Sequence, residues 1–167
     1  MTVARNLRKA FYVPVVAALL VALTLTPQPG ARGERVVAER IVVDLHTGLA
    51  IGGFDPVAYF VEGDAVPGKG DFEHALADTV WRFRNEGNRA AFVDNPEVYM
   101  PRFGGYDPVA VAREVGVPGN PRLWLIVENR LYLFYSPEAR TAFAGNFKTI
   151  VEAAARNWPA VQTTLSP

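Results

Sequence analysis

Cysteine is absent from this chain of 167 residues, and histidine occurs only twice, as His46 and His74. Without a thiol the protein can form no disulfide, no thiolate-ligated metal site and no cysteine nucleophile. The two histidines are too far apart in sequence for a zinc-binding motif such as H-E-x-x-H. Every proposal that depends on a thiolate is therefore excluded.

An excess of one charge is also absent, because 17 lysines and arginines balance 17 aspartates and glutamates. Three of the basic residues, Arg5, Arg8 and Lys9, stand near the N-terminus, and without them 14 basic residues face 17 acidic ones. Nucleic-acid-binding domains show the opposite balance, a basic surface that attracts phosphates. We therefore expect no nucleic acid among the partners.

The first 25 residues differ in character from the rest. After the basic start, residues 10–25 carry no charge, which is the layout of an export signal. This run is longer than a typical signal core and shorter than the roughly 20 residues that span a bilayer. We expect either a cleaved signal peptide or an uncleaved N-terminal anchor, the anchor being the only membrane contact. In both cases the basic flank predicts an extracytoplasmic location, periplasmic or secreted.

Half of the residues are hydrophobic, which is enough for one compact domain, whereas two smaller domains would each bury little surface. Residues 26–40 are rich in proline, glycine and arginine and are predicted to be a linker. We place the folded domain at residues 41–160 and a C-terminal tail at residues 161–167.

Two segments of the chain are nearly identical. Residues 53–58 read G-F-D-P-V-A, and residues 105–110, 52 positions later, read G-Y-D-P-V-A. Glycine permits a positive φ, aspartate accepts hydrogen bonds from the free N–H groups of a helix start, and proline suits the first helical turn. Asp55 and Asp107 are thus predicted to cap two short helices. Such a repeat indicates a duplicated structural unit.

Further matches at an offset of 51 extend the repeat, since residues 80–83 align with 131–134 and residues 89–92 with 140–143. We predict an α+β fold, a single domain of two tandem hairpin-plus-helix units packed on one core. The units span about residues 53–104 and 105–157. The strands are predicted at 41–45, 72–76, 79–83, 123–127 and 131–135, the last four forming two hairpins.

Polar residues before apolar segments predict further helices. Asn85 and Ser136 are expected to cap the helix that follows each hairpin, and each of these helices should end at an asparagine, Asn95 or Asn146. The last helix should bury one face, which has helical spacing: Phe147, Ile150, Val151, Ala154 and Trp158.

Several motifs together resemble a known family. They read G-F-D-P-V-A-Y-F at 53–60, V-W-R-F at 80–83, N-R at 88–89, N-P-E-V-Y at 95–99, F-G-G-Y at 103–106, L-Y-L at 131–133 and N-W-P at 157–159. In this order the set resembles the exported YHS domain-containing proteins. The resemblance implies a small extracytoplasmic α+β protein, and a heavy-metal-binding role is the usual suggestion for YHS domains.

The chain departs from this family at one position. The family's second motif looks like G-G-Y-C, with cysteine or selenocysteine, whereas this chain has Asp107 there. A carboxylate suits hard cations such as Ca²⁺ or Mg²⁺, while soft ions such as Cu⁺ prefer thiolates. Asp107 therefore cannot take over the chemistry of the cysteine.

The two aspartates are candidates for a site as well as helix caps. Asp55 and Asp107 occupy equivalent points of the two predicted units, so their packing could bring the carboxylates together. Two adjacent carboxylates would share a proton or hold a cation. No nucleophile or oxyanion loop stands near them in sequence.

The other candidates are aromatic or histidine. Tyr59, Tyr99 and Tyr106 each lie beside a helix start or a glycine pair, where they would either edge a pocket or pack in the core. His74 shares a predicted strand face with Phe72 and Leu76. It is expected to be a semi-buried, hydrogen-bonded histidine or, with Asp107, a weak metal ligand.

From the sequence we therefore expect an extracytoplasmic YHS-like binding module without catalytic residues. Its ligand would be a small molecule or a metal ion held without thiolates near Tyr106 and Asp107. One alternative is a structural or interaction domain that has lost a metal or redox site and binds a protein. Another is an acid–base enzyme that uses Asp55 and Asp107.

Overall fold

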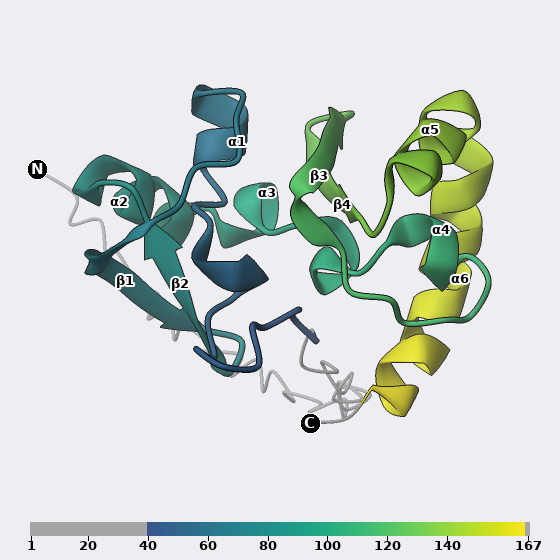
Figure 1. Cartoon of the computed structure of the whole chain (residues 1–167), viewed down its shortest axis with the longest axis horizontal. Helices are drawn as coiled ribbons and strands as arrows, with labels where there is room; N and C mark the ends of the chain where they lie inside the picture. The colour runs from purple at the N-terminus through teal and green to yellow at the C-terminus, as the bar shows by residue number, and fades with distance from the viewer. Residues whose placement is uncertain (1–39, 166–167) are drawn as a thin grey trace, which may run out of the picture. The chain divides into compact units, whose positions relative to one another are not determined.

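The computed structural model describes residues 40–165 and shows an α+β fold (Figure 1). The predicted export signal or anchor, nearly all of the predicted linker and the last two residues of the predicted tail lie outside the described residues. Within residues 40–165, no helix is both long and apolar enough to cross a membrane.

The same order of elements occurs twice along the chain. Each set has a 3₁₀ helix, a short α-helix, an antiparallel hairpin that forms its own two-stranded sheet, and two further helices. The first set is η1 (Ile51–Gly53), α1 (Ala58–Val61), β1 (Lys69–Leu76), β2 (Thr79–Phe83), α2 (Glu86–Asp94) and α3 (Pro96–Tyr99). The second set is η2 (Arg102–Gly105), α4 (Pro108–Val111), β3 (Asn120–Val127), β4 (Arg130–Phe134), α5 (Pro137–Gly145) and α6 (Phe147–Thr164).

Both hairpins turn through two residues of positive φ. These are Ala77 (55°) and Asp78 (56°) between β1 and β2, and Glu128 (50°) and Asn129 (57°) between β3 and β4. Such turns match the right-handed twist of the strands they join. The two predicted hairpins are confirmed, although β1 and β3 each begin three residues before the predicted start and β4 ends one residue before its predicted end.

The predicted alternation along β1 is also confirmed. Phe72, His74 and Leu76 are half-buried, whereas Glu73 and Ala75 on the opposite face are exposed. A strand places successive side chains on opposite faces, so one face of β1 packs inward and the other meets solvent.

The helices after the hairpins begin where the sequence predicts. The Asn85 side chain accepts a hydrogen bond from the Asn88 N–H at 2.9 Å, and the Ser136 hydroxyl accepts one from the Ala139 N–H at 3.2 Å. Each oxygen satisfies an N–H group that has no partner within its helix. Asn95 and Asn146 end these helices, as predicted.

The predicted strand at residues 41–45 is not formed. Val43 makes an isolated bridge with Ala50, and the backbone of Val42 bonds to two different turns, donating to Gly104 C=O at 2.8 Å and accepting from Ile51 N–H at 2.8 Å. The β-branched residues here favour a strand, but their backbone connects η1 to η2 instead of joining a sheet.

Buried side chains form two clusters, where we expected one core. The first contains Tyr59, Trp81, Phe83 and Phe92, and the second is built around helices α4–α6. Strand β4 belongs to both, because alternate residues point to opposite faces: Leu131 and Leu133 to the first cluster, Tyr132 and Phe134 to the second. In Figure 1 the β3–β4 hairpin accordingly lies between the β1–β2 hairpin and α4–α6.

The last helix is longer than the predicted domain. Its apolar face packs in the second cluster as predicted, but α6 continues through Thr164, and Val161 and Gln162 are buried. Residues 161–164 therefore belong to the folded part, whereas the sequence placed them in a tail. The end of α6 packs over Gly116, where an added Cβ would collide with the Leu165 side chain.

Candidate functional site

Asp55 and Asp107 make the same set of contacts in the two halves of the structure. Oδ1 of Asp55 accepts hydrogen bonds from the N–H groups of Val57 (2.8 Å) and Ala58 (3.3 Å) at the start of α1. Oδ1 of Asp107 accepts from the two corresponding N–H groups at the start of α4, at 2.7 and 3.3 Å. The predicted helix cap is confirmed for Asp107, which is the N-cap residue of α4. Asp55 makes the same two bonds, but α1 begins only at Ala58, with Val57 as its N-cap residue.

The second carboxylate oxygen reaches a distant part of the chain. Oδ2 of Asp55 accepts from the N–H of Arg84, just after β2, at 2.7 Å, and Oδ2 of Asp107 accepts from the N–H of Tyr135, just after β4, at 2.8 Å. Asp55 receives a fourth hydrogen bond from the Asn88 side chain at 2.7 Å. Each carboxylate therefore ties a helix start to the end of a hairpin.

Burial leaves these carboxylates little room for another partner. Asp55 is 0% exposed and Asp107 is 2% exposed. A buried carboxylate is tolerated when it accepts several hydrogen bonds, which is the case for both. Their hydrogen bonds have no partner in common among the described residues, so the structure does not join them into a proton-sharing pair.

The glycine two residues before each aspartate also has the same conformation and the same type of hydrogen bond in both halves. Gly53 and Gly105 have φ of 76° and 89°, and their carbonyls accept from the N–H groups of Gly68 (2.9 Å) and Gly119 (3.0 Å). The last two glycines each end a V-P-G sequence, at 66–68 and 117–119. This V-P-G repeat was not among the predicted motifs, although it has the same offset of 51 and is visible in the sequence.

Tyr59 lies against the second hairpin. Its hydroxyl donates to the Pro121 carbonyl at 2.9 Å, and its ring packs edge-on against Trp124 with 5.3 Å between ring centroids. Burial, with the negative charge of Asp55 adding to it, raises the pKa of Tyr59 well above its ordinary value. Tyr59 therefore packs in the core, where it is almost fully buried.

Tyr59 should make the protein sensitive to alkali. Because the pKa of Tyr59 is raised in the folded state, the unfolded chain loses the phenolic proton at a lower pH than the folded protein does. The contribution of protonated Tyr59 to the free energy of unfolding is therefore complete below pH 10 and is lost as the pH rises toward the folded-state pKa. We expect the free energy of unfolding to fall above pH 10 by up to about 1.4 kcal/mol per pH unit. Tyr59→Phe should make this decline less steep, while costing about 1 kcal/mol at neutral pH. Denaturant unfolding at several pH values measures both effects.

The matched control is Tyr135→Phe, which removes a hydroxyl from a residue that is 67% exposed. This variant should keep the wild-type decline. An equal decline in wild type and Tyr59→Phe would contradict the assignment to Tyr59.

The other two tyrosine candidates are half-buried with aromatic neighbours. Tyr99 packs edge-on against Phe60 at 5.4 Å between centroids, and Tyr106 lies 5.6 Å from the ring of Trp158. Burial also raises the pKa of Tyr106. Both therefore contribute mainly to packing, and the structure does not bring Tyr99 and Tyr106 into one pocket with Asp107.

His74 is semi-buried, as predicted, but among the described residues its side chain has no hydrogen-bond partner; its neighbour is the ring of Phe92 at 6.4 Å between centroids. Across residues 40–165, no group of three or more His, Asp or Glu side chains is close enough to hold a metal ion. No contact joins His74 and Asp107 in this part of the chain, so the structure assembles no metal site from the predicted ligands.

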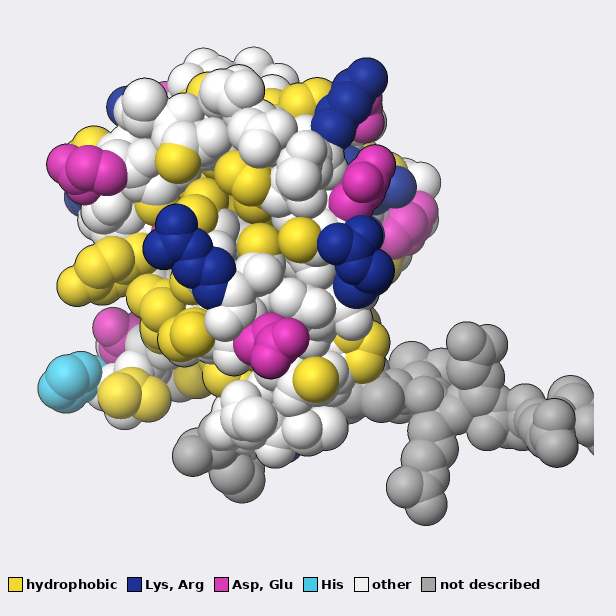
Figure 2. Space-filling model, turned by 90° about the vertical axis from the view of Figure 1, so that its right-hand side faces the viewer, with side chains coloured by type: hydrophobic (Ala, Val, Ile, Leu, Met, Phe, Trp, Pro, Cys, Tyr) yellow, Lys and Arg dark blue, Asp and Glu magenta, His cyan; other side chains and the backbone are white. Residues whose placement is uncertain are grey.

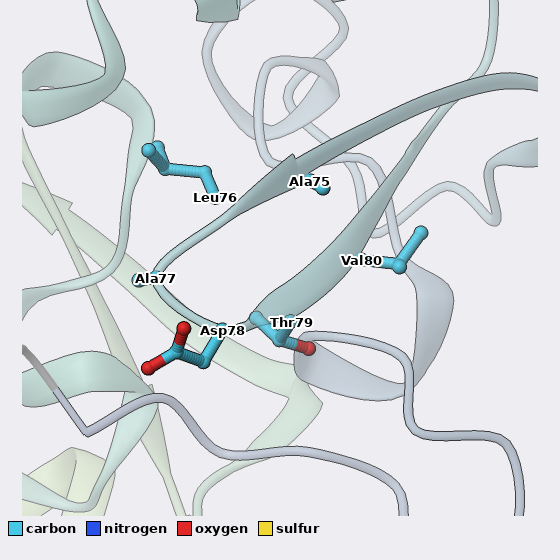
Figure 3. A pocket seen from close by; sticks show the side chains of 6 residues that line it. All are labelled: Ala75, Leu76, Ala77, Asp78, Thr79 and Val80. Atoms are coloured by element: carbon cyan, nitrogen blue, oxygen red, sulfur yellow. The ribbon is translucent and has the colours of Figure 1, made fainter.

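Two shallow hollows lie on the surface. One of about 500 Å³ is lined by residues 75–80 at the tip of the first hairpin (Figure 3), and one of about 420 Å³ lies on α5. The first presents one carboxylate, Asp78, and one hydroxyl, Thr79, which already donates to Gly48 C=O at 3.0 Å. On the face in Figure 2, charged side chains of both signs are interspersed with apolar ones. Neither hollow gathers the groups that a catalytic site requires.

Residues that carry the YHS resemblance have structural roles. Trp81 is buried, Asn88 donates to Asp55, and the Asn157 side chain donates to Ala112 C=O at 3.0 Å. Trp158 packs against Phe103 and Tyr106. Comparisons with family profiles, with curated proteins and with solved structures found no match to this chain. The motif residues named here thus contribute packing and hydrogen bonds to the fold.

Proposed function

We propose that this protein is an extracytoplasmic, non-catalytic interaction domain, a diverged YHS-like fold built from two tandem units. The observation that carries the proposal is the state of Asp107. The residue at the position of the family cysteine is buried and accepts three backbone hydrogen bonds. A side chain used in this way holds the fold and has no free face for a ligand.

The repeat supports the same conclusion. Asp55 makes the equivalent bonds in the first half, where the family resemblance implies no reactive residue. A residue whose contacts are duplicated at a second, non-reactive position is best explained by a structural role. Function then has to reside on the surface, and the proposed activity is binding to another polypeptide.

A metal and ligand screen tests the proposal. Protein purified from its native compartment should contain no stoichiometric metal, and a panel of metal ions and small molecules should leave its melting temperature unchanged, because only binding to the folded state raises it. A stoichiometric metal, or a rise in melting temperature that Asp107→Asn abolishes, would instead favour a ligand-binding module at Tyr106 and Asp107. Asp71→Asn, on an exposed strand residue, is the matched control.

A further inference from the structure

The outer edge of β3 is an apolar strand edge without a partner strand. β3 pairs only with β4, and no isolated bridge within residues 40–165 involves residues 123–127. These five residues, L-W-L-I-V, carry no charge, and their half-buried side chains pack against the two clusters, so the edge offers a partner its unpaired backbone. An unpaired strand edge without charges is a template for pairing with another strand.

The first hairpin provides an internal comparison. At the equivalent edge, β1 carries Lys69, Asp71 and Glu73, all exposed, and Glu73 pairs with Arg82 at 2.7 Å. Charged edge residues of this kind are how proteins prevent strand pairing. In the second hairpin, Arg122 stands in place of Asp71 and Trp124 in place of Glu73. The charge nearest the centre of the edge is thus replaced by an aromatic ring. Only the second hairpin is left open to association.

The register of the hairpin shows which backbone groups face outward. In a two-residue turn the first strand's last carbonyl accepts from the second strand's first N–H, so Val127 and Arg130 form a hydrogen-bonded pair. Bonded and non-bonded pairs alternate in an antiparallel ladder. Leu125 is therefore bonded to Tyr132, while the N–H and C=O groups of Trp124 and Ile126 point away from β4.

We infer that this edge pairs antiparallel with β3 of a second copy of the chain, in a register centred on Leu125. In that register Trp124 of one copy faces Ile126 of the other, so the outward N–H and C=O groups of both strands meet as hydrogen-bonded pairs. Arg122 of each copy then approaches Glu128 of the other, the first residue of the β3–β4 turn, and both residues are exposed at opposite ends of the apolar stretch. The edge is thus complementary to itself in both hydrogen bonding and charge.

This inference rests on the proposed function, because it names the partner of the interaction domain as the protein itself. A contact limited to one strand pair is small compared with the roughly 1,200–2,000 Å² buried in stable complexes. The dimer should therefore be weak, with a dimer fraction that rises with protein concentration.

Substitutions that reverse the charge of Glu128 or Arg122 test the register. The dimer fraction of the full-length chain is measured by sedimentation velocity. Glu128→Arg places arginine against Arg122 at both ends of the strand pair and should weaken the dimer about tenfold or more. Arg122→Glu should weaken it similarly, and the double exchange should restore wild-type association. Because Arg122 also lies 5.1 Å over the Phe54 ring, Glu128→Arg is the primary variant. Its unfolding curve should match the wild type.

Amide exchange provides a second readout at the backbone. The N–H groups of Trp124 and Ile126 should exchange more slowly as the protein concentration rises, while that of Leu125, bonded within the hairpin, should not change. A monomer at every concentration tested, or a dimer that is indifferent to both single exchanges, contradicts the inference. Neither result bears on the proposed structural role of Asp107. A metal site at Asp107, in contrast, would overturn that role and would leave the inferred dimer unaffected.

Discussion

Replacing Asp107 by alanine should lower the free energy of unfolding by about 3 kcal/mol or more. The variant leaves the N–H groups of Val109, Ala110 and Tyr135 without their acceptor in a partly buried place, although the Tyr135 side chain itself is exposed. Each unsatisfied buried donor costs about 1–3 kcal/mol, and the helix cap is lost as well. Since domains are stable by only about 5–15 kcal/mol, this is a large fraction of the total.

Equilibrium denaturation measures the effect, with two comparisons. Asp55→Ala should cost at least as much, because Asp55 accepts four hydrogen bonds where Asp107 accepts three. Asp71→Ala, on an exposed residue of β1, should change stability by less than about 0.5 kcal/mol. If Asp107→Ala were as stable as Asp71→Ala, the carboxylate would not be holding the fold.

Gly119→Ala should destabilise the protein by several kcal/mol, and Gly68→Ala should do the same in the first half. A Cβ at Gly119 would lie 2.7 Å from the Gly105 carbonyl oxygen and 2.9 Å from the Leu133 carbonyl carbon. At Gly68 it would lie 2.5 Å from the Arg82 carbonyl carbon. Because these contacts are to backbone, the clash is relieved only by moving a strand, and overpacking of this kind costs about 1–3 kcal/mol or more.

Gly145→Ala is the matched control, because nothing lies within 4 Å of the Cβ it would add. This glycine is in α5, where alanine is favoured over glycine by about 0.5–1 kcal/mol, so the same substitution should stabilise the protein. The sign of the change in denaturation midpoint should differ between the two sites. If the alanine substitutions at Gly68 and Gly119 raised the denaturation midpoint as Gly145→Ala does, the strands next to these two glycines would be able to move aside at little cost.

Local chemistry is what the sequence predicts well in this protein. Asp107, Asn85 and Ser136 are helix caps because the N–H groups they bind lie two or three residues ahead. The hairpins follow from apolar stretches on either side of a short turn. None of these features depends on distant parts of the chain.

Longer-range features could not be predicted in the same way. The bonds from Asp55 to Arg84 and from Asp107 to Tyr135 join residues 29 and 28 positions apart, and no local pattern marks them. The β-branched residues 41–45 look like a strand, but their partners are the turns at η1 and η2. Two apolar clusters form because both faces of β4 are covered, which only the packing of the two halves determines.

The most direct test of the structural role of Asp107 is the free energy of unfolding of Asp107→Cys, measured with and without Zn²⁺. This substitution places a cysteine where the family that the chain resembles has one. We predict a loss of about 2 kcal/mol or more, because a thiol is a weak acceptor for three backbone N–H groups, and no change on adding Zn²⁺. A variant as stable as the wild type that gains further stability with Zn²⁺ would contradict the account and show that a metal site persists there.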